Sequence, residues 1–193
     1  MRICVYGASA RELDEEYVQE AYRFGEELAR AGHSLVFGGG AEGLMGACAR
    51  GVSAAGGEIL GIAPRFFDEP GILYQDCTRF LFTDTMAQRK TAMADNCDAF
   101  LALPGGIGTF EEFFETLTLK QLGRHQKPMA LLDTRGYYAP LLAMLEKAAD
   151  EGFLGRGCFA LFGLCHSPQE ALHYLESAKS PVGSTKRLLD YGK

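Results

Sequence analysis

The chain has 193 residues, of which 47% are hydrophobic and 23% are charged, and these proportions are typical of a soluble globular protein. Its net charge of −6 argues against a general affinity for nucleic acid or anionic membranes, although a local pocket can still bind a small anion. The six cysteines are scattered, without a C-x-x-C pair or a zinc-like spacing to histidine, which favours free thiols in a reducing cytoplasm. Because the N-terminus enters a strand-like run at once and no apolar stretch approaches transmembrane length, we expect no signal peptide and no membrane span.

Apolar runs and helical patterns alternate along the chain. Strands are predicted at residues 2–6, 34–37, 58–62, 80–82, 99–103, 128–132 and 159–164, and helices at 14–31, 44–55, from 85 onward, from a glycine-rich turn to 122, 138–151 and 167–176. Because the strands are apolar throughout rather than at alternate positions, they indicate a parallel sheet covered on both faces. We therefore predict an α/β fold, a Rossmann-like three-layer sandwich with a mostly parallel sheet. A single domain would span residues 1–176, and the polar residues 177–193 would form a flexible tail.

Three loops rich in small residues follow predicted strands, at Gly7-Ala8-Ser9, at residues 38–43 and at Pro104-Gly105-Gly106-Ile107-Gly108-Thr109. Such loops meet at the carboxyl edge of a parallel sheet, where ligands bind. Glycines let the backbone approach an anion, and the following helix aims free N–H groups and its positive dipole end at it. A tight connection without a ligand is the alternative, but two glycine-rich loops on neighbouring strands favour a phosphate site.

Other nucleotide and catalytic motifs fit the chain poorly. Residues 38–43 match G-x-G-x-x-G, but they follow the second strand, and the acidic Glu58 begins the next strand instead of ending it, which argues against NAD. No G-x-x-x-x-G-K-[ST] sequence and no nucleophile elbow occur, and the four histidines lack metal-ligand spacing. We therefore predict no metal and no cofactor.

Two groups of charged residues stand out. Thr109 and Glu112 have the T-x-x-E spacing of a helix capping box, so Glu112 is either a cap or a catalytic carboxylate, with Glu111 and Glu115 as competitors. Arg89 and Lys90 share a predicted helix face with Met86 and Met93. These cations either lie at the surface or bind phosphate or ribose, Arg89 with its planar fork. Spacing alone decides neither the role of Glu112 nor the role of the cations.

The sequences G-G-G-A-E-G-L-M-G at residues 38–46, Arg89-Lys90 and P-G-G-I-G-T-F-E-E at residues 104–112 resemble the Lonely Guy (LOG) family. Its members are cytokinin riboside 5′-monophosphate phosphoribohydrolases. Further stretches around Gln121-Leu122-Gly123, Gly136-Tyr137-Tyr138 and Glu151-Gly152-Phe153 are similar to the family, so that the resemblance covers about residues 1–176. An older description of the family as lysine decarboxylases is set aside, because no lysine is presented for a pyridoxal Schiff base.

The resemblance implies a hydrolase that cleaves the N-glycosidic bond of adenine or N6-prenyl-adenine riboside 5′-monophosphates to free base and ribose 5-phosphate, as in cytokinin activation. It assigns catalysis to Arg89 and Glu112. It assigns substrate binding to Ser9, Gly40, Met86, Lys90, Gly105, Gly106, Ile107, Gly108, Thr109, Glu111 and Thr118. A cytoplasmic homodimer without a cofactor is expected.

Three departures from the family pattern concern base preference. This chain has Ala8 where the family has serine, Gln88 where it has glutamate, and Leu119 where it has tryptophan. A non-catalytic nucleotide or cofactor carrier of the same superfamily is the alternative function, and a Rossmann oxidoreductase is a more distant one.

Overall fold

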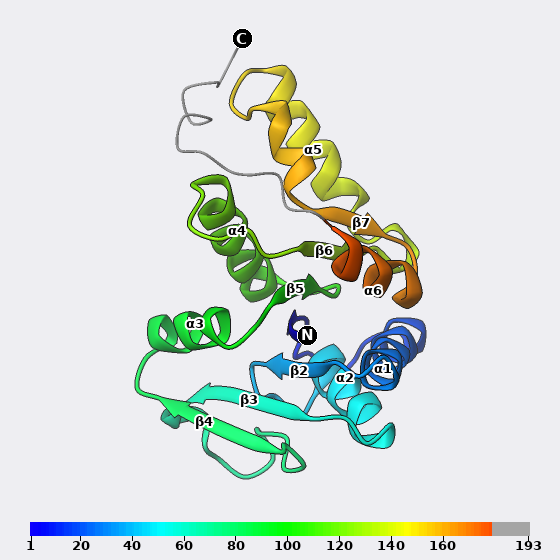
Figure 1. Cartoon of the computed structure of the whole chain (residues 1–193), viewed down its shortest axis with the longest axis vertical. Coiled ribbons are helices and arrows are strands. Elements are labelled where there is room, and N and C mark those ends of the chain that lie inside the picture. The colour runs from blue at the N-terminus through cyan, green and yellow to red at the C-terminus, as the bar shows by residue number, and fades with distance from the viewer. Residues whose placement is uncertain (179–193) are drawn as a thin grey trace.

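The computed structural model describes residues 1–178, which are built around a seven-stranded sheet (Figure 1). All neighbouring strands are parallel, in the order β4-β3-β2-β1-β5-β6-β7. The strands are β1 (Arg2–Tyr6), β2 (Ser34–Phe37), β3 (Ile59–Pro64), β4 (Arg79–Thr83), β5 (Ala99–Ala102), β6 (Met129–Leu132) and β7 (Gly163–Cys165). Every residue of β5 and β6 is buried, because helices cover both faces of the sheet. The predicted α/β sandwich is confirmed.

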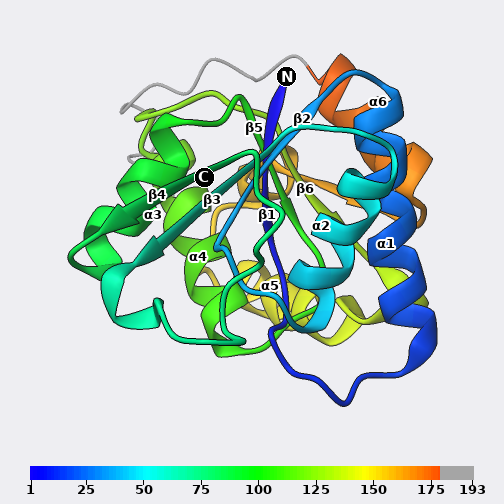
Figure 2. The same ribbon diagram turned by 90° about the horizontal axis from the view of Figure 1, so that it is seen from below.

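Six α-helices in the described residues form the two outer layers. They are α1 (Glu15–Arg30), α2 (Gly43–Ala54), α3 (Met86–Asp95), α4 (Ile107–Gln121), α5 (Ala139–Asp150) and α6 (Pro168–Ser177). Helices α1, α2 and α6 lie on one face of the sheet, and α3, α4 and α5 lie on the other (Figures 1 and 2). None of the helices in residues 1–178 is both long and apolar enough to cross a bilayer.

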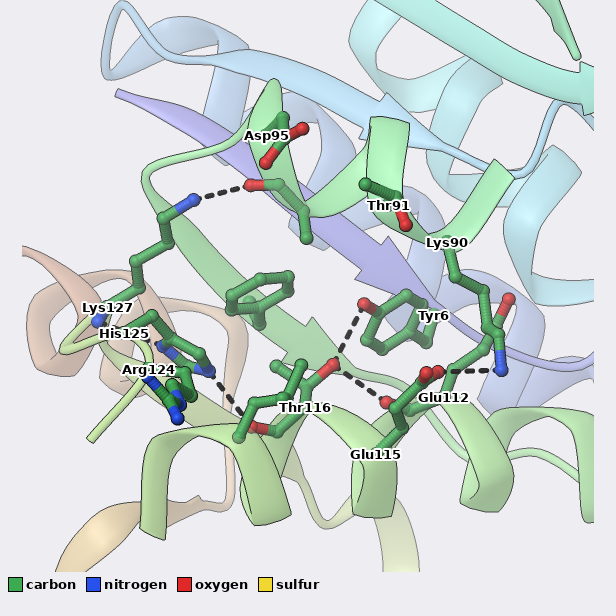
Figure 3. A pocket seen from close by; sticks show the side chains of 13 residues that line it. Tyr6, Lys90, Thr91, Asp95, Glu112, Glu115, Thr116, Arg124, His125 and Lys127 are labelled. Carbon is green, nitrogen blue, oxygen red and sulfur yellow. Dashed lines mark hydrogen bonds and ion pairs between the residues drawn. The ribbon is translucent and has the colours of Figure 1, made fainter. Parts of the chain in front are cut away.

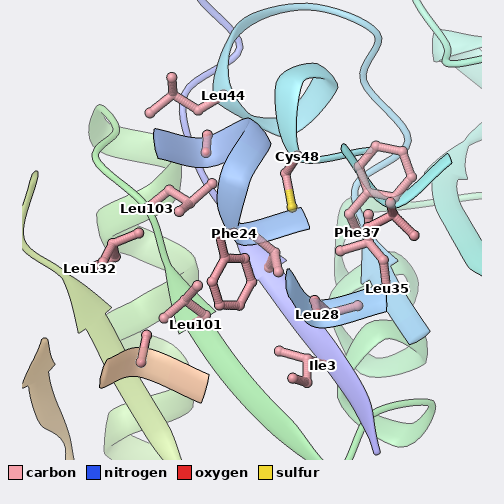
Figure 4. Close-up of a cluster of buried hydrophobic side chains, with 14 of the residues drawn as sticks. Ile3, Phe24, Leu28, Leu35, Phe37, Leu44, Cys48, Leu101, Leu103 and Leu132 are labelled. Carbon is pink, nitrogen blue, oxygen red and sulfur yellow. The ribbon is translucent and has the colours of Figure 1, made fainter. Parts of the chain in front are cut away.

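Each face of the sheet has its own hydrophobic core. On the α1 side, Phe24 and Leu28 pack with Leu35 and Leu101 of the sheet (Figure 4). On the α4 side the buried residues include Tyr6, Met93, Phe100, Phe113, Leu117 and Tyr138. The second core matters for the architecture around the loops, because it holds α4 against β1 and α3 against β3 and β4 on the same face of the sheet.

The strand order reverses between β1 and β5. The chain runs outward from β1 to β4, returns to β5 beside β1, and continues outward to β7 on the other side. Ligands of open parallel sheets bind beyond the carboxyl ends of the strands at such a reversal. The loops after β1 and β5 meet there, since the Ala8 N–H donates to the Pro104 carbonyl at 3.1 Å.

The predicted strand at residues 159–164 is wrong over most of its length. Residues Arg156–Leu161 form a 3₁₀ helix, and β7 begins only at Gly163. Cys158 and Leu161 are the buried residues of this helix, a spacing of three that matches its period. The surrounding run is apolar enough that sequence periodicity could not separate the two structures. The tail predicted for residues 177–193 lies, from residue 179, outside the described residues.

Candidate active site

The glycine-rich turn after β5 leads directly into α4. Gly106 is the N-cap of α4, and no side chain in the described part of the protein caps this end. The N-terminal N–H groups of α4 and its positive dipole end are therefore available to an anion. Only glycine fits at position 105, because a Cβ atom there would lie 2.1 Å from the Thr109 hydroxyl oxygen. The space around Gly106 and Gly108 is open, so a ligand could reach the backbone.

The second glycine-rich loop, at residues 38–43, packs against other parts of the site. A Cβ atom at Gly38 would lie 2.0 Å from Nη2 of Arg89, so the missing side chain makes room for the guanidinium. At the start of α2, the Leu44 N–H donates to the Ala8 carbonyl at 2.9 Å. The loop at residues 38–43 therefore makes room for the Arg89 side chain and is bonded to the loop after β1. At least one N–H group at the N-terminus of α2 already has a partner within the protein.

Arg89 and Glu112 form a buried ion pair. Nη1 of Arg89 lies 2.9 Å from Oε1 of Glu112, and the two side chains are only 8% and 10% exposed. Nε of Arg89 also donates to the Ile62 carbonyl at 3.3 Å. Thr85 caps α3 by accepting a hydrogen bond from the Gln88 N–H at 3.1 Å. This cap fixes where α3 begins and therefore where the Arg89 side chain projects from the helix. The interpretation of Arg89 as a surface cation is wrong.

The capping-box interpretation of Thr109 and Glu112 is also wrong. Helix α4 begins at Ile107, two residues before Thr109, so Thr109 already lies inside the first turn. The Glu112 carboxylate instead faces Arg89. Burial raises the pKa of Glu112 above its usual value, and the positive charge of Arg89 opposes that rise. A carboxylate that is costly to ionise and lies in a cleft is typical of functional sites.

The neighbouring carboxylates have a different partner. Lys90 bonds to Glu111, and its Nζ lies 2.7 Å from Oε2 of Glu115. These hydrogen bonds raise the pKa of Lys90, so it stays protonated. Glu111 and Glu115 are about half exposed, whereas Glu112 is buried beside Arg89. Of the three candidates, Glu112 is therefore the carboxylate in the low-dielectric environment.

A cavity of about 300 Å³ extends from Glu112 between α3 and α4 (Figure 3). Tyr6 and Phe100 contribute aromatic rings from the sheet, stacked with centroids 6.0 Å apart. Its lining is Tyr6, Lys90, Thr91, Ala94, Asp95, Phe100, Glu112, Glu115, Thr116, Leu119, Arg124, His125 and Lys127. The Tyr6 and Thr116 hydroxyls lie 3.2 Å apart, and Thr116 donates to the Glu112 carbonyl at 2.8 Å. Burial lowers the pKa of His125, which favours a neutral imidazole in this wall.

The predicted site residues do not all lie together. The fold brings Arg89, Lys90, Glu111 and Glu112 together, and the turn from Gly105 to Thr109 lies at the N-terminus of the helix that carries Glu112. Ser9, Gly40 and Met86 lie in the loop after β1, in the loop after β2 and at the start of α3. Thr118 lies eleven residues after Ile107 and so about 16 Å along α4, exposed and outside the cavity lining. It is not brought to the glycine-rich turn.

Several residues of the site were missed by sequence reasoning. Tyr6, Thr116 and His125 line the cavity, and Gly38, rather than Gly40, contacts Arg89. The sequence gives little indication of these roles, because a tyrosine in an apolar strand and a threonine in a helix are usually interpreted as residues of the hydrophobic core. Among residues 1–178, no group of three or more histidine, cysteine, aspartate or glutamate side chains is arranged to hold a metal ion.

Comparison with known proteins identifies the family. A family model described as "Possible lysine decarboxylase" matches residues 45–175. A probable cytokinin riboside 5′-monophosphate phosphoribohydrolase of Oryza sativa subsp. japonica is 38% identical over 91% of this chain and 72% of its own. Two phosphoribohydrolases of the same description from Arabidopsis thaliana are 38% and 42% identical, over 92% and 79% of this chain and 78% and 70% of their own. The chain belongs to the LOG family, which includes these relatives.

Solved structures agree with the family on the fold. The molybdenum cofactor binding protein of Rippkaea orientalis superposes with a TM-score of 0.70 at 22% identity, covering 91% of this chain and 95% of that one. The molybdenum cofactor carrier protein of Chlamydomonas reinhardtii gives 0.69 at 23% identity, with the same coverage. At 22% and 23% identity, these two solved structures show only that the present protein shares their fold. They give no information on the ligand of the present protein.

Proposed function

We propose that this protein hydrolyses the N-glycosidic bond of adenine or N6-prenyl-adenine riboside 5′-monophosphates and releases the free base and ribose 5-phosphate. The observation that carries the proposal is the buried Arg89–Glu112 pair, with Glu112 in the helix whose N-terminus carries the open glycine turn. The names of relatives 38–42% identical to the chain support the same reaction.

The 5′-phosphate would bind at the N-terminus of α4. Gly106 and Gly108 leave the backbone open there, Gly105 allows the close approach of Thr109, and Thr109 adds a hydroxyl. Glu112 follows Ile107 by five residues, or about 7.5 Å along the helix axis, a separation comparable with the length of a ribose 5-phosphate. Holding the phosphate at the turn therefore places the anomeric carbon near Glu112, which gives catalysis by orientation.

Glu112 would act on the sugar and the attacking water. Breaking the bond from C1′ to the base nitrogen develops positive charge on the ribose, which a nearby carboxylate stabilises. Ionised Glu112 accepts a proton from water as the water oxygen bonds to C1′, and the base leaves with the bonding electron pair and takes up a proton. Arg89 would bind the phosphate or ribose with its planar fork, and its shift toward the substrate would free Glu112.

The base would lie beyond the ribose. The cavity beside Glu112, with its Tyr6 and Phe100 rings, offers apolar surface for a purine or its N6 substituent. Met86, 39% exposed at the start of α3, offers a polarisable side chain near the same helix pair.

The decarboxylase description receives no support from this site. Lys90 is held by two carboxylates and is protonated, and Lys127, the other lysine of the cavity lining, donates to the Ala94 carbonyl. A Schiff-base lysine needs a free neutral amine.

We also propose that the protein is a cytoplasmic homodimer. Ile107 is 86% exposed and Leu119 is 38% exposed, so apolar surface lies beside the site where a second copy could cover it. All six cysteines are free, and five of them are buried, as suits a reducing compartment. Light scattering after size-exclusion chromatography tests the dimer, and a mass of one chain at micromolar concentration would exclude it.

A panel of substrates tests the reaction. The protein is incubated with AMP, N6-isopentenyl-AMP and adenosine, and the free base and ribose 5-phosphate are measured by chromatography. Both monophosphates should be cleaved, and adenosine should be a poor substrate because it lacks the phosphate that orients the sugar. Equal cleavage of adenosine and AMP would refute the phosphate role. Binding of AMP without release of adenine would instead favour a non-catalytic nucleotide carrier.

A further inference from the structure

Two adjacent tyrosines hold the turn at the N-terminus of α4 by hydrogen bonds to its backbone. The Tyr137 hydroxyl donates to the Gly105 carbonyl at 2.6 Å, and the Tyr138 hydroxyl donates to the Leu103 carbonyl at 2.7 Å. The two rings are nearly perpendicular, with centroids 5.2 Å apart. These contacts join residues more than 30 positions apart, so the segment after β6 fixes the turn after β5.

The bond from Tyr137 has a consequence that the bond from Tyr138 lacks. In a trans peptide the carbonyl and the next N–H point in opposite directions within one rigid plane. Holding the Gly105 carbonyl therefore points the Gly106 N–H away from Tyr137, and no atom lies within 4 Å of the position that a Cβ atom of Gly106 would take. The Leu103 carbonyl belongs to the peptide with Pro104, which has no N–H to orient.

The tyrosines are themselves held by a strained turn. Arg135 has a φ of 57°, a left-handed conformation that is uncommon for a residue other than glycine. Its guanidinium bonds to Asp14 at 2.7 Å, and the Tyr138 N–H donates to Asp133 at 2.7 Å. Strained backbone of this kind persists where the surroundings fix it, often beside functional sites.

We propose that Tyr137 is a positioning residue for the 5′-phosphate, whose hydroxyl aims the Gly106 N–H at the ligand, and that Tyr138 supports only the fold of the same turn. The proposal rests on the proposed function. A carbonyl that accepts a hydrogen bond also polarises its peptide, which strengthens the Gly106 N–H as a donor. Tyr137 acts through the backbone and does not need to touch the substrate.

The test compares Tyr137→Phe with Tyr138→Phe, which remove one hydroxyl each from adjacent residues. Tyr137→Phe should raise the KM for AMP and the Kd for ribose 5-phosphate about 3- to 10-fold, as expected for one hydrogen bond, and leave kcat and the weak cleavage of adenosine unchanged. Tyr138→Phe should lower the melting temperature, because the Tyr138 hydroxyl is buried, and leave the ratio of AMP to adenosine cleavage unchanged.

Two kinetic outcomes would overturn the assignment of Tyr137. One is an equal effect of Tyr137→Phe on AMP and adenosine, and the other is an equal rise in KM for AMP in both variants. Calorimetric titration with ribose 5-phosphate separates this proposal from the reaction. If the native protein releases no base, the proposed reaction fails, and weaker binding of ribose 5-phosphate by Tyr137→Phe still supports the positioning role. If the native protein does not bind ribose 5-phosphate, the positioning role of Tyr137 fails, whether or not base is released from AMP.

Discussion

Glu112→Gln should make the protein more stable and almost inactive at the same time. The substitution keeps the size of the side chain and removes the negative charge that faces Arg89 at 2.9 Å. Loss of acid–base assistance lowers rates by about 10²- to 10⁴-fold, which corresponds to about 3–5 kcal/mol in the activation free energy. The kcat for AMP should fall by that factor, with a smaller change in KM, because the proposed contacts to the phosphate do not involve the Glu112 carboxylate.

The stability change follows from the direction of the pKa shift. Burial raises the pKa of Glu112 even though Arg89 opposes the rise, so the folded protein holds this proton more tightly than the unfolded chain does. Stability is therefore lost as the pH rises through the raised pKa, and at neutral pH the ionised carboxylate destabilises the fold. A neutral glutamine removes that cost. A single stabilising substitution commonly contributes about 0.5–2 kcal/mol, which is a rise of roughly 1–8 °C in melting temperature for a chain of this size.

The assay pairs thermal melting at pH 7.5 with release of adenine from AMP. Glu146→Gln is the matched control, because Glu146 lies on α5 in an exposed ion pair with Arg156 and should change neither quantity measurably. A melting temperature several degrees below the native value would show that the attraction between Arg89 and Glu112 outweighs the cost of burial. That result would refute the reasoning on stability, and an unchanged kcat would refute the catalytic role.

Three further predictions concern the same site. The first is a pH profile of kcat/KM for AMP, corrected for the substrate phosphate, which has a second pKa of about 6. Because burial raises the pKa of Glu112, kcat/KM should fall on the acid side with a pKa above the ordinary glutamate value of 4.5. An acid-side pKa at or below 4.5 would contradict this prediction. Gly38→Ala places a Cβ atom 2.0 Å from the Arg89 guanidinium, so kcat should drop about 10²-fold while circular dichroism shows a folded protein. An unchanged kcat would show that the position of Arg89 beside Gly38 does not matter for catalysis. Ala94→Leu narrows the cavity and should lower kcat/KM for N6-isopentenyl-AMP about 10-fold more than for AMP; Ala87→Leu, on the exposed face of the same helix, is the control, and equal losses with both substrates would place the base elsewhere.

Local patterns predicted most of the fold, because strands and helices here have clear periods and ends. Thr85 was predicted to open a helix, and it caps α3 through the Gln88 N–H. The failure near residues 156–161 came from a run that is apolar at nearly every position, where a 3₁₀ helix and a strand bury similar residues.

The site was harder to predict, because its chemistry depends on contacts between distant residues. Arg89 and Glu112 are 23 positions apart on different helices, and spacing alone could not show that they pair. The capping box was misplaced because α4 begins at Ile107, and glycine at the N-cap leaves no side-chain signal. The contact from Tyr137 to Gly105 crosses from one strand–helix unit to the next, which no local pattern records.

The central position of β1 has a consequence for how the protein is made. This strand pairs with β2 on one side and with β5, residues 99–102, on the other. A nascent chain that ends before β5 therefore exposes an apolar strand edge, which is prone to pair with other chains. The loops after β1 and β5 lie at the ends of these two paired strands, so the site can form only after this distant pairing closes. We expect fragments that stop near residue 95 to aggregate rather than to fold as half-domains.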